Sequence, residues 1–152
     1  MSNSRYTVLS LFLVLVFSGI FLLGSCTRTE ETQSGKQMMM DGAKMMMDGN
    51  KMMMDEMMKK EMIKEGPMME SHKIMLEGEK AMKEGQALLE GEKMVEGREM
   101  MVDAATRMMA AEKSMMDEMT KQGVQKEGLM ANAEKMMIDG QKMVMDGSAK
   151  AK

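Results

Sequence analysis

The sequence predicts an all-α protein in which extended, methionine-rich helices form a coiled coil or a loose helical bundle. Methionine accounts for 30 of the 152 residues, and the seven-residue unit MMMDGAK at residues 38–44 is followed directly by MMMDGNK at residues 45–51. Large and small apolar residues alternate at steps of three and four, the spacing that keeps residues on one face of an α-helix. Acidic and lysine residues are interleaved on the other positions, as on a solvated helix surface.

The composition indicates a soft core. All three phenylalanines and the only tyrosine precede residue 26, and the sequence has no tryptophan. Methionine therefore supplies most of the side-chain volume that the helices can bury, and its three rotatable bonds fill gaps without specifying one fit. We expect a dynamic helical assembly. The alternative that part of the chain stays disordered until something binds it is left open.

Residues 1–25 are predicted to be a secretory signal peptide. Arg5 precedes an apolar run at residues 8–23, and the small residues Gly24 and Ser25 follow that run. A basic start, a short apolar core and a small-residue exit are typical of a cleaved leader, and the run is slightly short for a permanent membrane span.

The four residues Leu23-Gly24-Ser25-Cys26 resemble the lipobox of bacterial lipoproteins. The resemblance implies that the leader is cut before Cys26, that fatty acyl chains such as palmitate are attached through the Cys26 sulfur, and that the new amino terminus is acylated. Three acyl chains exceed the two signals that stable membrane anchoring requires. An uncleaved anchor with an idle cysteine is the alternative.

The same resemblance implies a location. Thr27 is not the aspartate that often retains such proteins at the inner membrane of a Gram-negative cell. We therefore expect a lipid-anchored protein of the cell membrane or outer membrane that faces the periplasm or the exterior. With Cys26 acylated, the chain has no cysteine left for a disulfide bond.

After the leader, residues 26–36 are predicted to be the lipidated N-terminus and a flexible tether, because they are polar and lack periodic apolar positions. Residues 37–147 form the methionine-rich helical repeat region. Its first break is expected near residues 66–67, because proline disfavours helix in the residue that precedes it.

One long helix is predicted from residue 67 to residue 121, with a local irregularity or bend near residues 91–97, where the glycine spacing changes to six. Gly123 and Gly128 bracket a second break, at residues 123–128. A further helix follows, and residues 148–152 are predicted to be a disordered tail.

A packing seam runs through these helices. Its large positions are methionine, its small positions are glycine or alanine, and its members are Met39, Gly42, Met46, Gly49, Met75, Gly78, Met82, Gly85, Met101, Ala104, Met108, Ala111 and Met115. Glycine costs about 1 kcal/mol relative to alanine inside a helix. We therefore expect helices to approach closely across the small positions, with methionine side chains lying over glycine of the neighbouring helix.

Charge and chemistry exclude two classes of function. The formal net charge is −3, and nucleic-acid binding requires a basic face, so no nucleic-acid partner is expected. The chain has one histidine, its only cysteine is assigned to lipid, and it carries no recognisable acid–base–nucleophile set or phosphate-binding loop. The sequence therefore predicts a non-enzyme without a cofactor.

We interpret the sequence as a membrane-anchored bacterial cell-envelope lipoprotein that acts as a helical structural and interaction module. Its expected partners are the membrane, through the lipid anchor, and either a second copy of itself or another envelope protein.

The alternative function is periplasmic binding or buffering of Cu(I) or Ag(I) by methionine thioethers. Thioethers favour Cu(I) over hard cations, and in composition the chain is similar to methionine-rich copper and silver binders. Three consecutive helical residues spread over about 200° and cannot converge on one ion, whereas residues three or four apart can. The candidate ligands are therefore Met54, Met58 and Met62, and the group of Met68, His72 and Met75. A methionine face that binds a partner, or a sacrificial sink for oxidants, is a further alternative.

Overall fold

The computed structural model describes the backbone of residues 4–63, 66–124 and 128–151, and the side chains within those ranges from residue 30 onward. This part of the chain contains no strand and four α-helices: α1 (Ser4–Lys59), α2 (Pro67–Glu90), α3 (Met94–Lys121) and α4 (Leu129–Lys150). The predicted all-α bundle is confirmed, and coiled-coil geometry stays a prediction.

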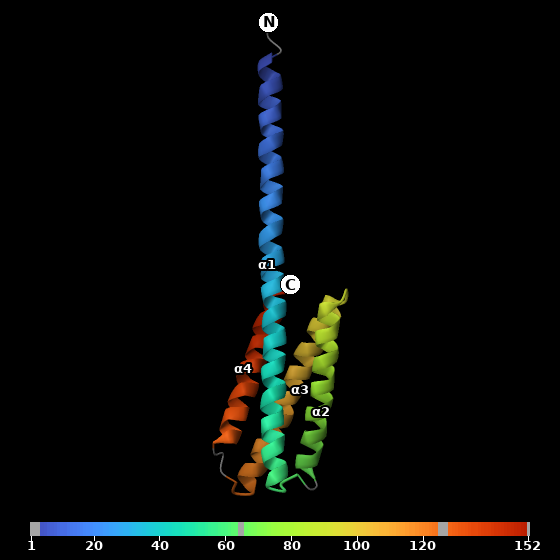
Figure 1. The fold of residues 1–152 in the computed structure, drawn as a ribbon, viewed down its shortest axis with the longest axis vertical. Coiled ribbons are helices and arrows are strands. Elements are labelled where there is room, and N and C mark those ends of the chain that lie inside the picture. The colour runs from blue at the N-terminus through green and yellow to red at the C-terminus, as the bar shows by residue number, and fades with distance from the viewer. Residues whose placement is uncertain (1–3, 64–65, 125–127, 152) are drawn as a thin grey trace.

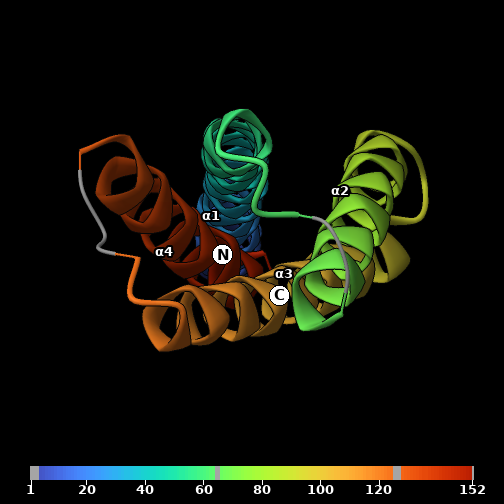
Figure 2. The same cartoon turned by 90° about the horizontal axis from the view of Figure 1, so that it is seen from below.

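The four helices run alternately in opposite directions (Figure 1). The α1–α2 and α3–α4 connections lie at one end of the bundle, and the α2–α3 connection lies at the other end. Seen along the bundle, α1 lies between α4 and α2, with α3 on the opposite side (Figure 2). Because α1 packs mainly against α4 and α2 mainly against α3, the bundle consists of two antiparallel helix pairs. The first half of α1 extends beyond the other helices (Figure 1).

The α1·α4 pair is built on glycines that face each other. A Cβ atom on Gly42 would lie 2.6 Å from the carbonyl oxygen of Gly140, and a Cβ atom on Gly140 would lie 2.6 Å from the carbonyl oxygen of Gly42. The Cγ atom of Met46 would lie 2.7 Å from that second Cβ atom, so the methionine side chain covers the glycine. The arrangement repeats at Gly147, whose Cβ atom would lie 2.5 Å from the carbonyl oxygen of Gly35.

The α2·α3 pair follows the same rule. A Cβ atom on Gly97 would lie 2.7 Å from the carbonyl oxygen of Gly85, and one on Gly85 would lie 2.5 Å from the Cγ atom of Met101. The side chain of Met108 covers Gly78 in the same way. Every member of the predicted seam is buried. The seam therefore closes between helices of one chain, and its glycines permit close backbone approach inside the bundle.

The prediction of one helix from residue 67 to residue 121 is wrong, because the chain reverses between Glu90 and Met94. Gly91 ends α2 in an extended conformation, with φ −92° and ψ −158°, while its N–H still donates to the carbonyl oxygen of Ala87 at 3.2 Å. The change in glycine spacing marks this reversal rather than a bend. The reversal lets the two halves bury each other's seams, which a continuous helix cannot do.

The two predicted breaks coincide with the ends of helices. The helix α2 begins at Pro67, a position where the missing N–H of proline costs no hydrogen bond, and residues 122–128 separate α3 from α4. Gly66 and Gly123 have φ values of 73° and 71°, in the left-handed region that favours glycine.

The structure differs from the predicted tether and tail. Residues 30–36 belong to α1, and Gly35 is buried against Gly147. At the other terminus, α4 continues to Lys150, and Ala151 is 6% exposed. The N–H of Ala151 donates to the carbonyl oxygen of Gly147 at 2.9 Å, and its own carbonyl oxygen accepts from Arg98 Nη1 at 3.3 Å. Contacts at the end of the α1·α4 pair thus hold both residues 30–36 and the C-terminal residues up to Ala151 in place.

Among the residues whose side chains are described, no helix is long and apolar enough to cross a membrane. The apolar run at residues 8–23 lies outside that part of the chain.

Candidate functional site

The candidate site is a groove of about 440 Å³ between α1 and α2. These two helices belong to different pairs, and few of their residues meet directly. Because each helix places its seam against another partner, the faces that α1 and α2 turn toward each other are left partly open. We call this feature the α1–α2 groove.

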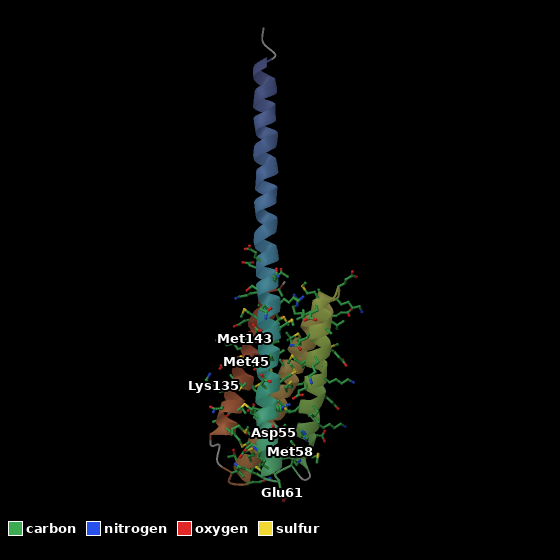
Figure 3. All side chains as sticks on the ribbon, viewed as in Figure 1. Met45, Asp55, Met58, Glu61, Lys135 and Met143 are labelled. Carbon is green, nitrogen blue, oxygen red and sulfur yellow. The ribbon has the colours of Figure 1, made fainter. Side chains whose placement is uncertain are left out.

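The residues that line the groove occupy one stripe on each helix. On α1 they include Met47, Asn50, Met54 and Met58, which are spaced by three, four and four residues and so share a face. On α2 they include His72, Leu76, Glu79 and Lys83, which are spaced by four, three and four residues. Figure 3 labels Asp55 and Met58 towards the end of α1 that leads into α2. The groove therefore brings thioethers from one helix to the single imidazole of the chain on another.

Asn50 is a buried polar residue in the wall of the groove, with 1% of its surface exposed. Its Nδ2 donates to Glu79 Oε1 at 2.5 Å, which links α1 to α2. Its Oδ1 has no hydrogen-bond partner among the described residues. Glu79 also lies 3.9 Å from Lys83 Nζ through its other oxygen. An unpaired acceptor in a polar groove is expected to receive a water molecule or an ion.

Sequence reasoning missed Asn50, although a signal was present. In the second copy of the seven-residue unit, Asn50 stands where Ala43 stands in the first copy. Ala43 is fully buried in the core. A polar residue at a buried position of a repeat indicates a local polar function, so a comparison of the two copies would have identified it.

The structure brings together some of the predicted metal ligands and separates others. Met54 is buried, Met58 is 53% exposed, and His72 is partly exposed, and all three line the groove. Met68 and Met75 are fully buried in the core. They lie three or four residues from His72, but neither of them lines the groove.

The remaining candidate, Met62, lies in the connection after α1. Its N–H donates to the carbonyl oxygen of Met57 at 3.0 Å, and its side chain is partly buried against the core. The structure therefore supports neither predicted group as a unit. The groove instead brings together Met54 and Met58 from the first group and His72 from the second, because these residues lie on the helix faces that line it.

In the described part of the chain, no three side chains among histidine, cysteine, aspartate and glutamate gather closely enough to hold a metal ion. No family model, curated protein or solved structure matches this chain. Cys26, the predicted lipidation site, lies in the portion of α1 whose side chains are not described.

An apolar surface adjoins the groove at the end where α1 leads into α2. Leu76 lines both the groove and a second hollow of about 800 Å³ at the start of α2, where Met69 is also found. The exposed fractions are 53% for Met58, 45% for Met69 and 52% for Leu76. We call these three residues the distal apolar surface.

Proposed function

We propose that this chain is a lipid-anchored bacterial envelope protein whose helical bundle acts as a non-enzymatic interaction module. The observation that carries the proposal is the position of Cys26, directly after an apolar run and the residues Leu23-Gly24-Ser25. A lipidated Cys26 becomes the first residue after the leader is removed and fixes that point of α1 at the membrane surface. The rest of the chain then faces the periplasm or the exterior.

The direction of α1 supports the interaction role. At a rise of 1.5 Å per residue, Met58 lies about 48 Å further along the helix than Cys26. The distal apolar surface therefore stands at the far end of the bundle from the proposed anchor. An exposed apolar cluster at such a place is suited to bind a second protein.

The distal apolar surface is available to a partner, whereas the packing seam is not. The seam glycines are already covered within the chain, so they are not available to a partner while the bundle is folded. Met58, Met69 and Leu76 remain exposed. Methionine adapts its shape to different surfaces, which suits a binding face of this kind.

The anchor is tested by replacing the cysteine. In cells fed a fatty-acid analogue, the Cys26→Ser variant should keep its leader and lose both labelling and membrane attachment, whereas a Thr27→Ser control should be labelled like the natural chain. Intact mass and labelling decide the result. Equal labelling of Cys26→Ser and the control would refute the lipid anchor.

The interaction role is tested with a photo-reactive residue in place of Leu76. Ile138 on α4 is a matched control, because it is 48% exposed and lies on a different helix. We expect light-induced cross-links from position 76 to another envelope protein or to a second copy, and few from position 138. Equal yields from the two positions would contradict a dedicated binding surface.

A further inference from the structure

The α1–α2 groove combines three soft donor groups that the sequence places far apart. Met54 and Met58 supply thioether sulfurs from α1, and His72 supplies an imidazole from α2. We propose that these three side chains form a binding site for a monovalent soft metal ion, Cu(I) or Ag(I). Thioethers select such ions over Mg²⁺ and Ca²⁺, and imidazole is compatible with copper. This site does not depend on the lipid anchor.

The placement of the two methionines suits joint coordination. Residues four apart on a helix are neighbours, with their Cβ atoms about 5–6 Å apart. Both thioethers sit at the end of flexible side chains, so their sulfurs can turn toward one ion. Exposure falls from Met58 at the rim to Met54, which is 5% exposed, at the base. An ion can therefore enter from solvent and be held where water is partly excluded.

Two further features of the wall favour a cation. The unpaired Oδ1 atom of Asn50 is an acceptor that can hold a bound water or the second N–H of a coordinating imidazole. The wall also carries three carboxylates and two ammonium groups, an acidic excess: Asp48, Asp55 and Glu79 against Lys51 and Lys83.

Other methionines lack this combination. The seam methionines, such as Met46 and Met108, are fully buried over glycine. Met38 Sδ accepts a hydrogen bond from Lys150 Nζ at 3.3 Å. Met109 and Met116 also line a hollow of about 520 Å³ between α3 and α4, but the lining of that hollow contains no imidazole. The second hollow, at the start of α2, also has His72 in its lining, but Met69 is the one thioether there. The α1–α2 groove thus combines several thioethers with the ring nitrogen.

Binding at this site would join the two helix pairs. The groove lies between α1, which packs on α4, and α2, which packs on α3. An ion held by both walls binds the folded state and not the unfolded one, so it raises stability according to its concentration relative to Kd.

The test uses the full-length protein in detergent, titrated with silver nitrate in chloride-free buffer. Methionine methyl signals and the histidine ring signals are followed by NMR, and heat is measured by calorimetry. The first equivalent of Ag(I) should shift the signals of Met54, Met58 and His72 and raise the melting temperature.

Three variants decide whether these residues hold the ion. The affinity for the first equivalent should fall about a hundredfold or more in Met54→Leu/Met58→Leu and in His72→Gln, since even the loss of a supporting outer-shell group costs 10–100-fold. A control with Met109→Leu and Met116→Leu, which line a hollow without an imidazole, should bind like the natural chain.

The proposal is overturned if the groove variants bind the first equivalent as tightly as the control, or if the first signals to shift belong to other methionines. Leucine keeps nearly the volume and apolarity of methionine and usually costs less than about 1.5 kcal/mol, so the bundle should survive the exchange. Should a variant lose its helical circular dichroism, the NMR shifts of the natural chain decide.

Discussion

The effect of glycine on stability differs between positions of this protein. Inside a helix, it costs about 1 kcal/mol relative to alanine, because the unfolded backbone has more freedom to lose. At Gly42 that cost accompanies backbone contact with Gly140 across the α1·α4 pair. At Gly91, by contrast, the nearest atom to an added Cβ is an oxygen of its own helix at 3.7 Å. The two positions differ in what surrounds the missing methyl group.

Alanine substitutions at these positions should separate the two effects. Gly42→Ala places a methyl group 2.6 Å from a carbonyl oxygen, so the helices must move apart, and overpacking of this kind costs about 1–3 kcal/mol. The gain of about 1 kcal/mol in helix propensity offsets part of this cost. We expect a net loss of up to about 2 kcal/mol in the free energy of unfolding, measured by urea denaturation.

Two further substitutions serve as controls. Gly91→Ala should be close to neutral, because its surroundings leave ordinary van der Waals room. Gly78→Ala should cost less than Gly42→Ala, because the group it meets first is the side chain of Met108, which can change rotamer, rather than backbone. A Gly42→Ala variant as stable as Gly91→Ala would show that the close approach does not exist in solution.

At the scale of the helix, the closest packing is within the two antiparallel pairs, α1·α4 and α2·α3. Within each pair, glycine and alanine allow backbones to meet, whereas α1 and α2 leave a groove between them. Ion pairs add little to this difference. Arg107 Nη2 and Glu77 Oε2 link α3 to α2 at 3.4 Å, but both side chains are about half exposed, where such a pair is typically worth about 0–1 kcal/mol.

A substitution that disrupts the α1·α4 pair should therefore destabilise this pair more than the α2·α3 pair. In Gly140→Leu, a bulky side chain would meet the backbone of α1, while Ala131→Leu changes only an exposed position of the same helix. We expect hydrogen exchange in α4 and in residues 30–59 to become at least about tenfold faster in Gly140→Leu, with a much smaller change in α2 and α3.

The control variant Ala131→Leu should exchange like the natural chain. Equal acceleration in all four helices of Gly140→Leu would instead indicate that the bundle opens as one cooperative unit. In that case the contacts between the two helix pairs would hold the bundle together as firmly as the contacts within each pair.

The whole molecule is a bundle with a methionine core. Among the largest fully buried side chains of the described residues, Leu89 is the single exception to methionine. Methionine buries apolar surface and adapts to irregular gaps, but it specifies side-chain packing weakly. The core is therefore buried but its packing is weakly specified. The rate of methionine oxidation tests whether such a core is closed to solvent.

Dilute hydrogen peroxide should distinguish a packed core from a loosely folded chain. Met58 and Met69 are about half exposed and should form sulfoxides first, whereas Met46 and Met108 are 0% exposed and should react only after unfolding. Peptide mass spectrometry against time gives the order, and the same chain in urea provides the control. If buried and exposed methionines react at one rate in native buffer, the core is not closed.

The amino-acid pattern was sufficient to predict the all-α class, the members of the seam and the break before Pro67. These features depend on residues a few positions apart, since a step of three or four places side chains on one face whatever lies opposite. For the same reason, the pattern placed Met54 and Met58 in one candidate group and His72 in another.

The tertiary arrangement determined what each face meets. It paired Gly42 with Gly140, reversed the chain at Gly91, and set His72 opposite the methionines of α1. It also showed that Asn50 is buried with an unpaired oxygen. Periodicity cannot supply these results, because it is the same for a helix that continues and for one that turns back. The direction of each connection decides which faces are brought together over long separations in the chain.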